Sequence, residues 1–164
     1  MTGRTGARDF EPWYRAQHAA LVTVLAAAVG DADLAKDAAD EALARAWRHW
    51  KRVSVMSSPE GWTYRVALNV ARRRGRRRSL EHAILRRQVP PSPVPGPTGE
   101  LWLLVGGLPP RQREAVLLRH VGQLTEPEIA EVMRVTRATV STTLRAAYAR
   151  LAMELESDPE RSLS

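Results

Sequence analysis

The sequence predicts an all-α protein of two small helical domains joined by a proline-rich linker. Apolar residues recur every three or four positions through most of the chain, which is the spacing of one helix face. Five of the eight residues from 90 to 97 are proline, a composition that excludes a helix and is typical of an extended linker. We therefore expect a first domain over residues 9–87, the linker over 88–97 and a second domain over 98–156.

The composition narrows the classes of function. The 164 residues include no cysteine, and the four histidines lack the spacing of metal ligands, so no metal and no cofactor is expected. The sequence has no apolar run of the roughly 18 residues that span a membrane, and its N-terminus lacks a signal-peptide core. A cytoplasmic protein is expected. Glycine-rich phosphate loops and nucleophile elbows are absent from the sequence, so an enzyme is not expected.

The excess of positive over negative charge lies in one segment. The net charge is +7, and residues 59–87 hold nine basic and two acidic side chains. Residues 1–58 hold eight basic and seven acidic side chains, and residues 108–164 hold eight of each. The excess charge predicts a polyanion-binding surface between residues 59 and 87.

The first domain is predicted to open with two helices. Residues 9–29 have a broad apolar face, and Gly30 is suited to end that helix. The second helix begins at Asp31 or Asp33, runs to about Trp50 and is rich in alanine, the best helix former. Its acidic residues gather in the N-terminal half, where the helix dipole favours them. Dipole complementarity with solubility is one interpretation of these acids, and a binding role is the other.

A third helix follows a predicted loop over residues 51–57, with Ser57 or Ser58 as its cap and Pro59 at its start. Six arginines fall between residues 72 and 78 and would repel one another without an anionic partner, which favours phosphate binding. Trp62 and Tyr64 could stack on an unpaired base, although a core position suits Trp62 at least as well. The helix is predicted to continue weakly to residue 87. Next to its core face runs a stripe of Arg65, Asn69, Arg72, Arg73 and Arg76.

The second domain is predicted to contain a helix-turn-helix. Thr98 is expected to cap a short apolar helix that ends at residues 106–107, and another helix runs from the prolines at 109–110 to residue 120. Thr125 and Glu128 form a capping box, and a turn over residues 134–136 precedes a second helix, which could lie in a DNA major groove. Small helical bundles also contain capped helices with short turns. The apolar face of that second helix holds Val140, Leu144, Ala147 and Leu151, and its outward face holds Arg137, Ala138, Ser141, Thr142 and Arg145.

Three segments resemble the extracytoplasmic-function (group 4) sigma factors, compact bacterial initiation factors that keep regions two and four of the sigma-70 family. Residues 30–47, GDADLAKDAADEALARAW, resemble region 2.2. Residues 58–78, SPEGWTYRVALNVARRRGRRR, resemble the arginine-rich stretch that follows it. Residues 108–133, LPPRQREAVLLRHVGQLTEPEIAEVM, resemble the opening of region four. The resemblance covers nearly the whole chain, from about Phe10 to Leu155.

The resemblance implies a region 2 bundle of three to four helices and a region 4 helix-turn-helix bundle. It also implies a sigma factor that binds core RNA polymerase and directs promoter recognition, DNA melting and transcription initiation. The implied partners are the clamp helices of the largest polymerase subunit, the flap of the second subunit, promoter DNA and an anti-sigma factor, without membrane insertion. The chemical reaction belongs to the polymerase.

By position, the resemblance also assigns site residues. The polymerase-binding set is Asp37, Asp40, Glu41, Arg45 and Trp47. The set for the minus-ten element and its melted strand is Ser57, Ser58, Trp62, Arg65, Asn69, Arg72, Arg73 and Arg76. The recognition-helix set for the minus-thirty-five element is Arg137, Thr139, Ser141, Thr142 and Arg145.

The chain departs from the family pattern at several positions. Lys36 stands where the family has an acidic residue, and Asp40 stands where it has glutamine. Residues 138–143, ATVSTT, replace the usual glycine followed by T-V-K-S-R. Losing a lysine and an arginine removes two contacts to phosphate or guanine. We predict that the isolated second domain binds duplex DNA weakly and with an altered base preference. Fluorescence anisotropy tests this, and low-nanomolar binding at physiological salt would contradict it.

Two other classes of protein fit parts of the pattern. One is a helix-turn-helix transcription regulator that binds DNA independently of polymerase. The other is a sigma-like decoy or interaction protein that no longer initiates transcription. A conventional regulator would carry a ligand-sensing or phospho-acceptor domain, which the sequence does not show.

Overall fold

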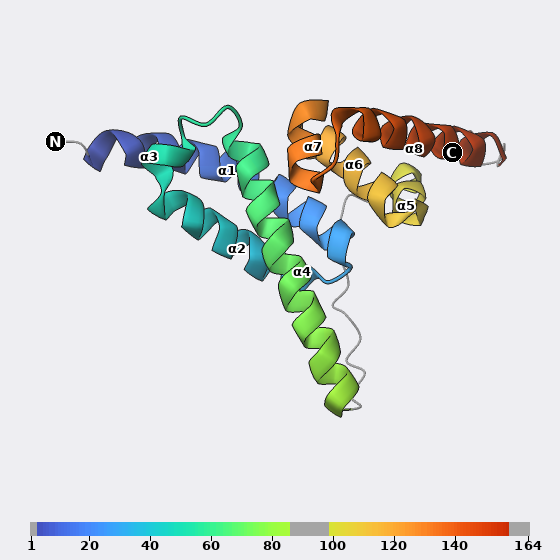
Figure 1. Ribbon diagram of the computed structural model, residues 1–164, viewed down its shortest axis with the longest axis horizontal. Helices are drawn as coiled ribbons and strands as arrows, with labels where there is room; N and C mark the ends of the chain where they lie inside the picture. The colour runs from blue at the N-terminus through green and yellow to red at the C-terminus, as the bar shows by residue number, and fades with distance from the viewer. Residues whose placement is uncertain (1–2, 86–98, 158–164) are drawn as a thin grey trace. The chain divides into compact units, whose positions relative to one another are not determined.

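The computed structural model describes residues 3–85 and 99–157, and all the regular structure in these ranges is helical (Figure 1). The chain divides into two compact units, Met1–Pro95 and Gly96–Ser164. The all-α fold class with two helical domains is therefore confirmed. The predicted linker over residues 88–97 lies outside the described residues.

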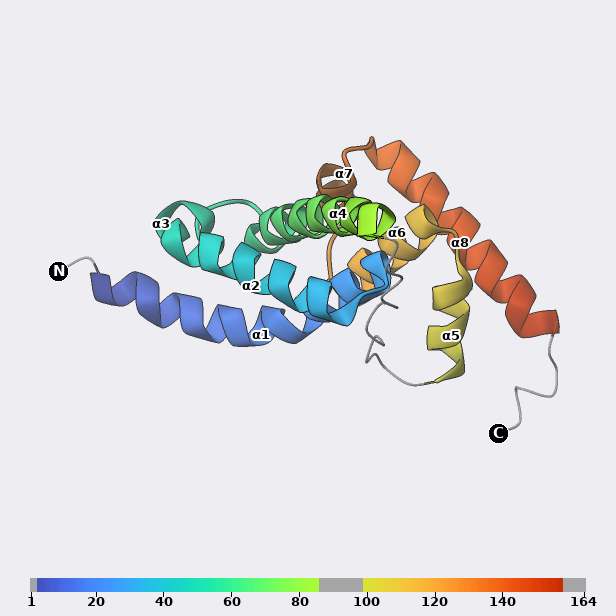
Figure 2. The same cartoon turned by 90° about the horizontal axis from the view of Figure 1, so that it is seen from below.

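The first unit consists of α1 (Gly3–Val29), α2 (Ala32–Arg48), α3 (Trp50–Val53) and α4 (Pro59–Leu85). Helix α2 packs against both α1 and α4, and α1 also contacts α4 (Figures 1 and 2). Alanine side chains let these helices approach closely because they add little bulk at the contact. The core contains Leu21, Leu25, Ala35, Ala38, Ala39, Ala42, Leu68 and Ala71.

Two predicted boundaries in this unit were wrong. Helix α1 begins at Gly3 rather than at residue 9, so that Pro12 lies inside it. The predicted loop over 51–57 is helical at its start, because helix α2 ends before His49 and the chain then forms the short helix α3. Trp50 begins α3 and is buried, so the hydrophobic effect holds this turn on the domain. The stop at Gly30 is confirmed, since its φ of 70° lies in the left-handed region that favours glycine.

Side-chain caps hold the starts of α2 and α4. Asp31 Oδ1 accepts a hydrogen bond of 3.0 Å from the Leu34 amide, and its Oδ2 pairs with Arg78. Ser58 Oγ accepts a hydrogen bond of 2.9 Å from the Gly61 amide. Ser58 rather than Ser57 therefore caps α4.

The second unit consists of α5 (Glu100–Gly107), α6 (Pro110–His120), α7 (Glu126–Met133) and α8 (Arg137–Ser157). Its core holds Val105, Leu108, Ala115, Leu117, Leu118, Leu124, Ile129, Val132, Val140, Leu144 and Ala147. Leu151, predicted on the same face of α8, is half-buried. Gly99 is the N-cap of α5, and Thr98, the predicted cap, lies outside the described residues.

The helix-turn-helix is built by local hydrogen bonds. The capping box of α7 is confirmed: Glu128 Oε2 accepts from the Thr125 amide at 2.6 Å. Arg134 ends α7 in the left-handed conformation, with φ of 55°. Thr136 Oγ1 then accepts from the Thr139 amide at 3.1 Å and caps α8. The predicted boundaries of both helices follow from these signals. None of the helices in the described residues is long and apolar enough to span a bilayer.

Candidate nucleic-acid interfaces

Helix α4 turns its arginine stripe away from the core of the first unit. Ala67, Leu68 and Ala71 are buried on one face of the helix, whereas Asn69 and Arg73 are exposed on another. Arg72 and Arg76 are also exposed, and Arg65 is half-buried. The structure therefore brings the predicted phosphate-binding residues of α4 together on one accessible stripe.

Within the 72–78 run, Arg74 and Arg78 form ion pairs inside the first unit. Arg74 pairs with Glu41 of α2, and Arg78 pairs with Asp31 at the start of α2. They lie on the side of α4 that faces α2, and their guanidinium groups brace the two helices. The run is therefore divided between structural pairs and an outward stripe, which one-dimensional charge counting does not show.

The aromatic residues at the start of α4 differ in accessibility. Tyr64 is 1% exposed, so its predicted availability for base stacking was wrong. It lies on the same face as Ala67 and Leu68, one helical turn away. Burial raises the pKa of the Tyr64 hydroxyl above its usual range, and the charge of Glu60 acts in the same direction. Trp62 is half-buried and packs against Ala46, Trp50 and Val53, so part of its ring stays accessible.

The segment between α3 and α4, residues 54–58, leads directly into the start of α4. Ser57 is exposed, whereas the half-buried Ser58 uses its hydroxyl oxygen to cap α4 and retains its hydroxyl hydrogen for donation. Val55 is 80% exposed in the same segment. The sequence did not predict the exposure of Val55, because an apolar residue between helices is usually expected to be buried.

The outer face of α2 carries the predicted polymerase-binding residues. Asp37 and Asp40 are exposed, and Trp47 is 48% exposed with its ring 4.9 Å from that of Phe10. Glu41 is half-buried, and its two carboxylate oxygens pair with Arg45 and Arg74. Three of the five residues are thus exposed, whereas Arg45 and Glu41 are half-buried, and Glu41 also connects α2 to α4 through Arg74.

In the second unit, Thr142 and Arg145 of α8 lie on the side opposite the buried Val140 and Leu144, whereas Arg137 lies one turn before Val140 at the start of the helix. Arg137, Thr139, Thr142 and Arg145 are exposed, and Ser141 is half-buried. Arg137 Nε lies 3.8 Å from Glu126 Oε2, and both groups are accessible enough for water and salt to weaken this pair. The outward face of α8 therefore carries mostly short side chains and little charge.

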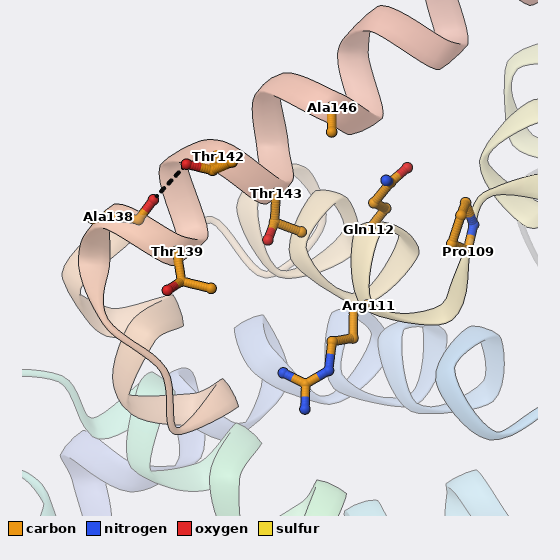
Figure 3. Close-up of a pocket in the computed structure, with 8 residues that line it drawn as sticks. All are labelled: Pro109, Arg111, Gln112, Ala138, Thr139, Thr142, Thr143 and Ala146. Atoms are coloured by element: carbon orange, nitrogen blue, oxygen red, sulfur yellow. Dashed lines mark hydrogen bonds between the residues drawn. The ribbon is translucent and has the colours of Figure 1, made fainter.

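A hollow of about 510 Å³ lies beside this face, between α8 and the start of α6 (Figure 3). Small side chains of α8 form one wall, and Thr142 donates a hydrogen bond of 3.0 Å to the Ala138 carbonyl there. Sequence reasoning missed this hollow, which only the packing of α6 on α8 creates. Its lining residues are Pro109, Arg111, Gln112, Ala138, Thr139, Thr142, Thr143 and Ala146.

A second, apolar groove of about 530 Å³ lies among α5, α6 and the later part of α8. Leu101 and Trp102 of α5 line it, together with Leu151 of α8. His120 and Tyr148 also line it, and the His120 Nε2 and Tyr148 Oη atoms form a hydrogen bond of 2.9 Å. An apolar groove of this kind suits a protein segment better than a polyanion.

Comparison with known proteins agrees with both halves of this arrangement. Residues 13–81 match the family model of sigma-70 region 2, and residues 98–151 match that of sigma-70, region 4. The RNA polymerase sigma-E factor of Streptomyces coelicolor is 31% identical over 153 residues, covering 90% of this chain and 86% of the relative. The sigma-E factor of Streptomyces antibioticus is 32% identical over 154 residues, covering 90% and 85%.

Solved structures share the fold. The sigma factor RpoE of Bartonella quintana, in complex with the anti-sigma factor NepR, superposes with a TM-score of 0.75 at 20% identity, covering 92% of this chain and 99% of that chain. CnrH, in complex with the cytosolic domain of CnrY, gives a TM-score of 0.58 at 21% identity, covering 93% and 90%.

The two matched regions place the chain among the non-enzymatic proteins that start transcription. It belongs to the sigma-70 family, in the extracytoplasmic-function group of RNA polymerase sigma factors, and it directs promoter recognition and transcription initiation.

Proposed function

We propose that the first domain, residues 9–87, binds core polymerase and the melted minus-ten element, while the second domain, residues 98–156, binds the minus-thirty-five element as duplex. The observation that carries this proposal is the outward arginine stripe of α4, which lies in a different unit from the helix-turn-helix. Single strands and duplexes need different surfaces: the first needs phosphate contacts beside unpaired bases, and the second needs a helix that enters the major groove.

On α4, the stripe supports contacts to the phosphates of the non-template strand. We assign these contacts to Arg65, Arg72, Arg73 and Arg76, each of which contributes to a linear salt dependence of affinity. Asn69 is exposed among them and can form two kinds of hydrogen bond with a base edge. Ser57 and Ser58 are candidates to read an unstacked base, and the accessible part of Trp62 supports the melted edge.

On α2, the exposed acids and Trp47 support docking on the clamp helices of the largest polymerase subunit. Asp37 and Asp40 supply negative charge, and Trp47 supplies a large amphipathic ring of the kind that dominates binding energy in interfaces. Arg45 lies beside them and pairs with Glu41. For Glu41, the two guanidinium partners support a role in setting the shape of this face, in addition to any direct contact.

In the second domain, we assign base and phosphate contacts in the minus-thirty-five duplex to Arg137, Thr139, Ser141, Thr142 and Arg145. The apolar groove lined by Leu101, Trp102 and Leu151 is suited to the flap of the second polymerase subunit. The prediction of weak duplex binding by this domain alone is consistent with the short side chains of α8, and it stays a prediction.

Two further assignments follow from the family. The structural relative RpoE is bound to the anti-sigma factor NepR, and we propose that an anti-sigma protein also binds this chain. We further infer that the chain acts in the cytoplasm, where core polymerase and promoter DNA are found.

The decisive experiment combines a pull-down with transcription. Tagged chain is mixed with core polymerase, and the holoenzyme is then used for run-off transcription from a duplex library with randomised minus-ten and minus-thirty-five segments. We expect core binding and transcripts that enrich one promoter sequence. Failure to bind core would contradict the proposal, and binding without transcripts would favour the decoy interpretation.

A further inference from the structure

Trp13 of α1 lies outside the surfaces assigned above, yet it contacts the chain on both sides of the 54–58 segment. Its indole Nε1 donates a hydrogen bond of 2.7 Å to Glu60 Oε1, in the first turn of α4. Its ring lies 4.8 Å from that of Trp50, at the start of α3. The segment therefore leaves one element held by Trp13 and enters another held by the same side chain.

The middle of the segment packs against the same cluster as Trp13, which consists of Ala46, Trp50 and Val53. Met56 makes this contact, and its amide donates to the Val53 carbonyl at 3.1 Å. Val55 and Ser57 point outward and are exposed. Met56 thus holds one side of the segment against this cluster, and the side that carries Val55 and Ser57 faces solvent.

We propose that Trp13 is a positioning residue for promoter melting, acting through Glu60 to hold the 54–58 segment in the shape that receives an unpaired base. The inference rests on the proposed function, in which Ser57 and Ser58 meet the non-template strand. A segment that is already ordered avoids the entropic cost of ordering on binding, and preorganisation of this kind raises affinity. The indole hydrogen bond supplies a fixed direction that ring packing alone does not supply.

The test uses Trp13→Phe and Glu60→Leu, each of which removes one end of the hydrogen bond. Glu60→Gln keeps an oxygen that can accept from the indole, and Glu11→Gln neutralises an exposed carboxylate of α1 that pairs with Arg15, as a matched control. Holoenzyme is assembled with each full-length variant on a promoter selected by the wild-type holoenzyme. The promoter carries 2-aminopurine in the non-template strand of the minus-ten element, so that its fluorescence reports base unpairing.

We expect Trp13→Phe and Glu60→Leu to weaken open-promoter formation roughly tenfold, the order expected for losing a hydrogen bond to a charged group. Glu60→Gln should retain most of the wild-type level of open-promoter formation, and Glu11→Gln should match the wild type. The affinity for core polymerase should stay constant, whereas a general loss of folding would lower it as well. In the double variant Trp13→Phe with Glu60→Leu, the two losses should not add.

Wild-type promoter opening by both Trp13→Phe and Glu60→Leu would overturn the inference. An equal loss with Glu60→Gln and Glu60→Leu would also overturn it, because the acceptor oxygen would then be irrelevant. If Trp13→Phe does not fold, the Glu60→Gln and Glu60→Leu pair still decides. Failure of the wild-type chain to bind core polymerase is a separate result that removes the proposed function and this inference together.

Discussion

Replacing Tyr64 by phenylalanine is expected to stabilise the first domain. The ring is 1% exposed, and the hydroxyl has no hydrogen-bond partner among the residues that the structure describes. Burying an unpartnered hydroxyl costs about 1–3 kcal/mol. The substitution removes this cost and leaves the ring in place, although a small void offsets part of the gain. We expect a net gain of about 1 kcal/mol, which corresponds to a rise of about 4–8 °C in Tm for a domain of this size.

The same residue makes stability sensitive to alkaline pH. Because burial raises the pKa of the Tyr64 hydroxyl, the folded chain keeps a proton that the unfolded chain loses at about pH 10. The unfolded state therefore binds fewer protons above that pH, so the titration of Tyr64 leaves the free energy of unfolding unchanged below about pH 10 and lowers it as the pH rises further. Tyr64→Phe should remove this part of the decline.

Thermal unfolding followed by circular dichroism between pH 7 and pH 11 measures both effects. Tyr14→Phe is the control, since Tyr14 is half-buried on α1 and its hydroxyl is not among the buried groups without a partner. A lower Tm for Tyr64→Phe at pH 7 would refute the reasoning, because it would mean that the hydroxyl makes a stabilising hydrogen bond in solution. An alkaline decline identical to that of the wild type would refute the titration argument.

Three further predictions concern single side chains. Asp31→Ala removes the cap of α2 and the partner of Arg78, and should destabilise the first domain by about 1–2 kcal/mol in thermal melts; an unchanged Tm would contradict this, and Asp37→Ala, at an exposed position of the same helix, is the control. Arg76→Ala should weaken holoenzyme binding to single-stranded minus-ten DNA and lower the slope against log salt by about 0.7; an unchanged slope would exclude a phosphate contact. Arg145→Ala should cost about 1–3 kcal/mol of binding to the selected minus-thirty-five duplex in anisotropy titrations and relax its base preference; equal binding by this variant would remove Arg145 from the recognition set.

Local signals predicted most helices correctly. The capping box at Thr125, the cap at Thr136 and the glycine stop at Gly30 act within a few residues, so the sequence alone defines them. The stripe on α4 follows from helical periodicity for the same reason. The start of α1 was missed because the prediction followed the apolar face, which begins at Phe10, and the helix extends before that residue.

Contacts between residues distant in the sequence were determined by the tertiary structure. Trp62 and Tyr64 are two residues apart and were given similar roles, but only packing against α1 to α3 determines which ring is buried. The same holds for Glu41 with Arg74 and for Trp13 with Glu60, which are 33 and 47 residues apart.

The sequence by itself therefore determined the helices, the two-domain organisation of the fold and the excess charge at α4. These properties depend on spacing, on composition and on hydrogen bonds that close over one helical turn. The tertiary structure decided which charges are used for internal pairs, which aromatic rings are accessible and where the grooves lie. These properties depend on how helices pack, and no local pattern records the residues that face one another across that contact.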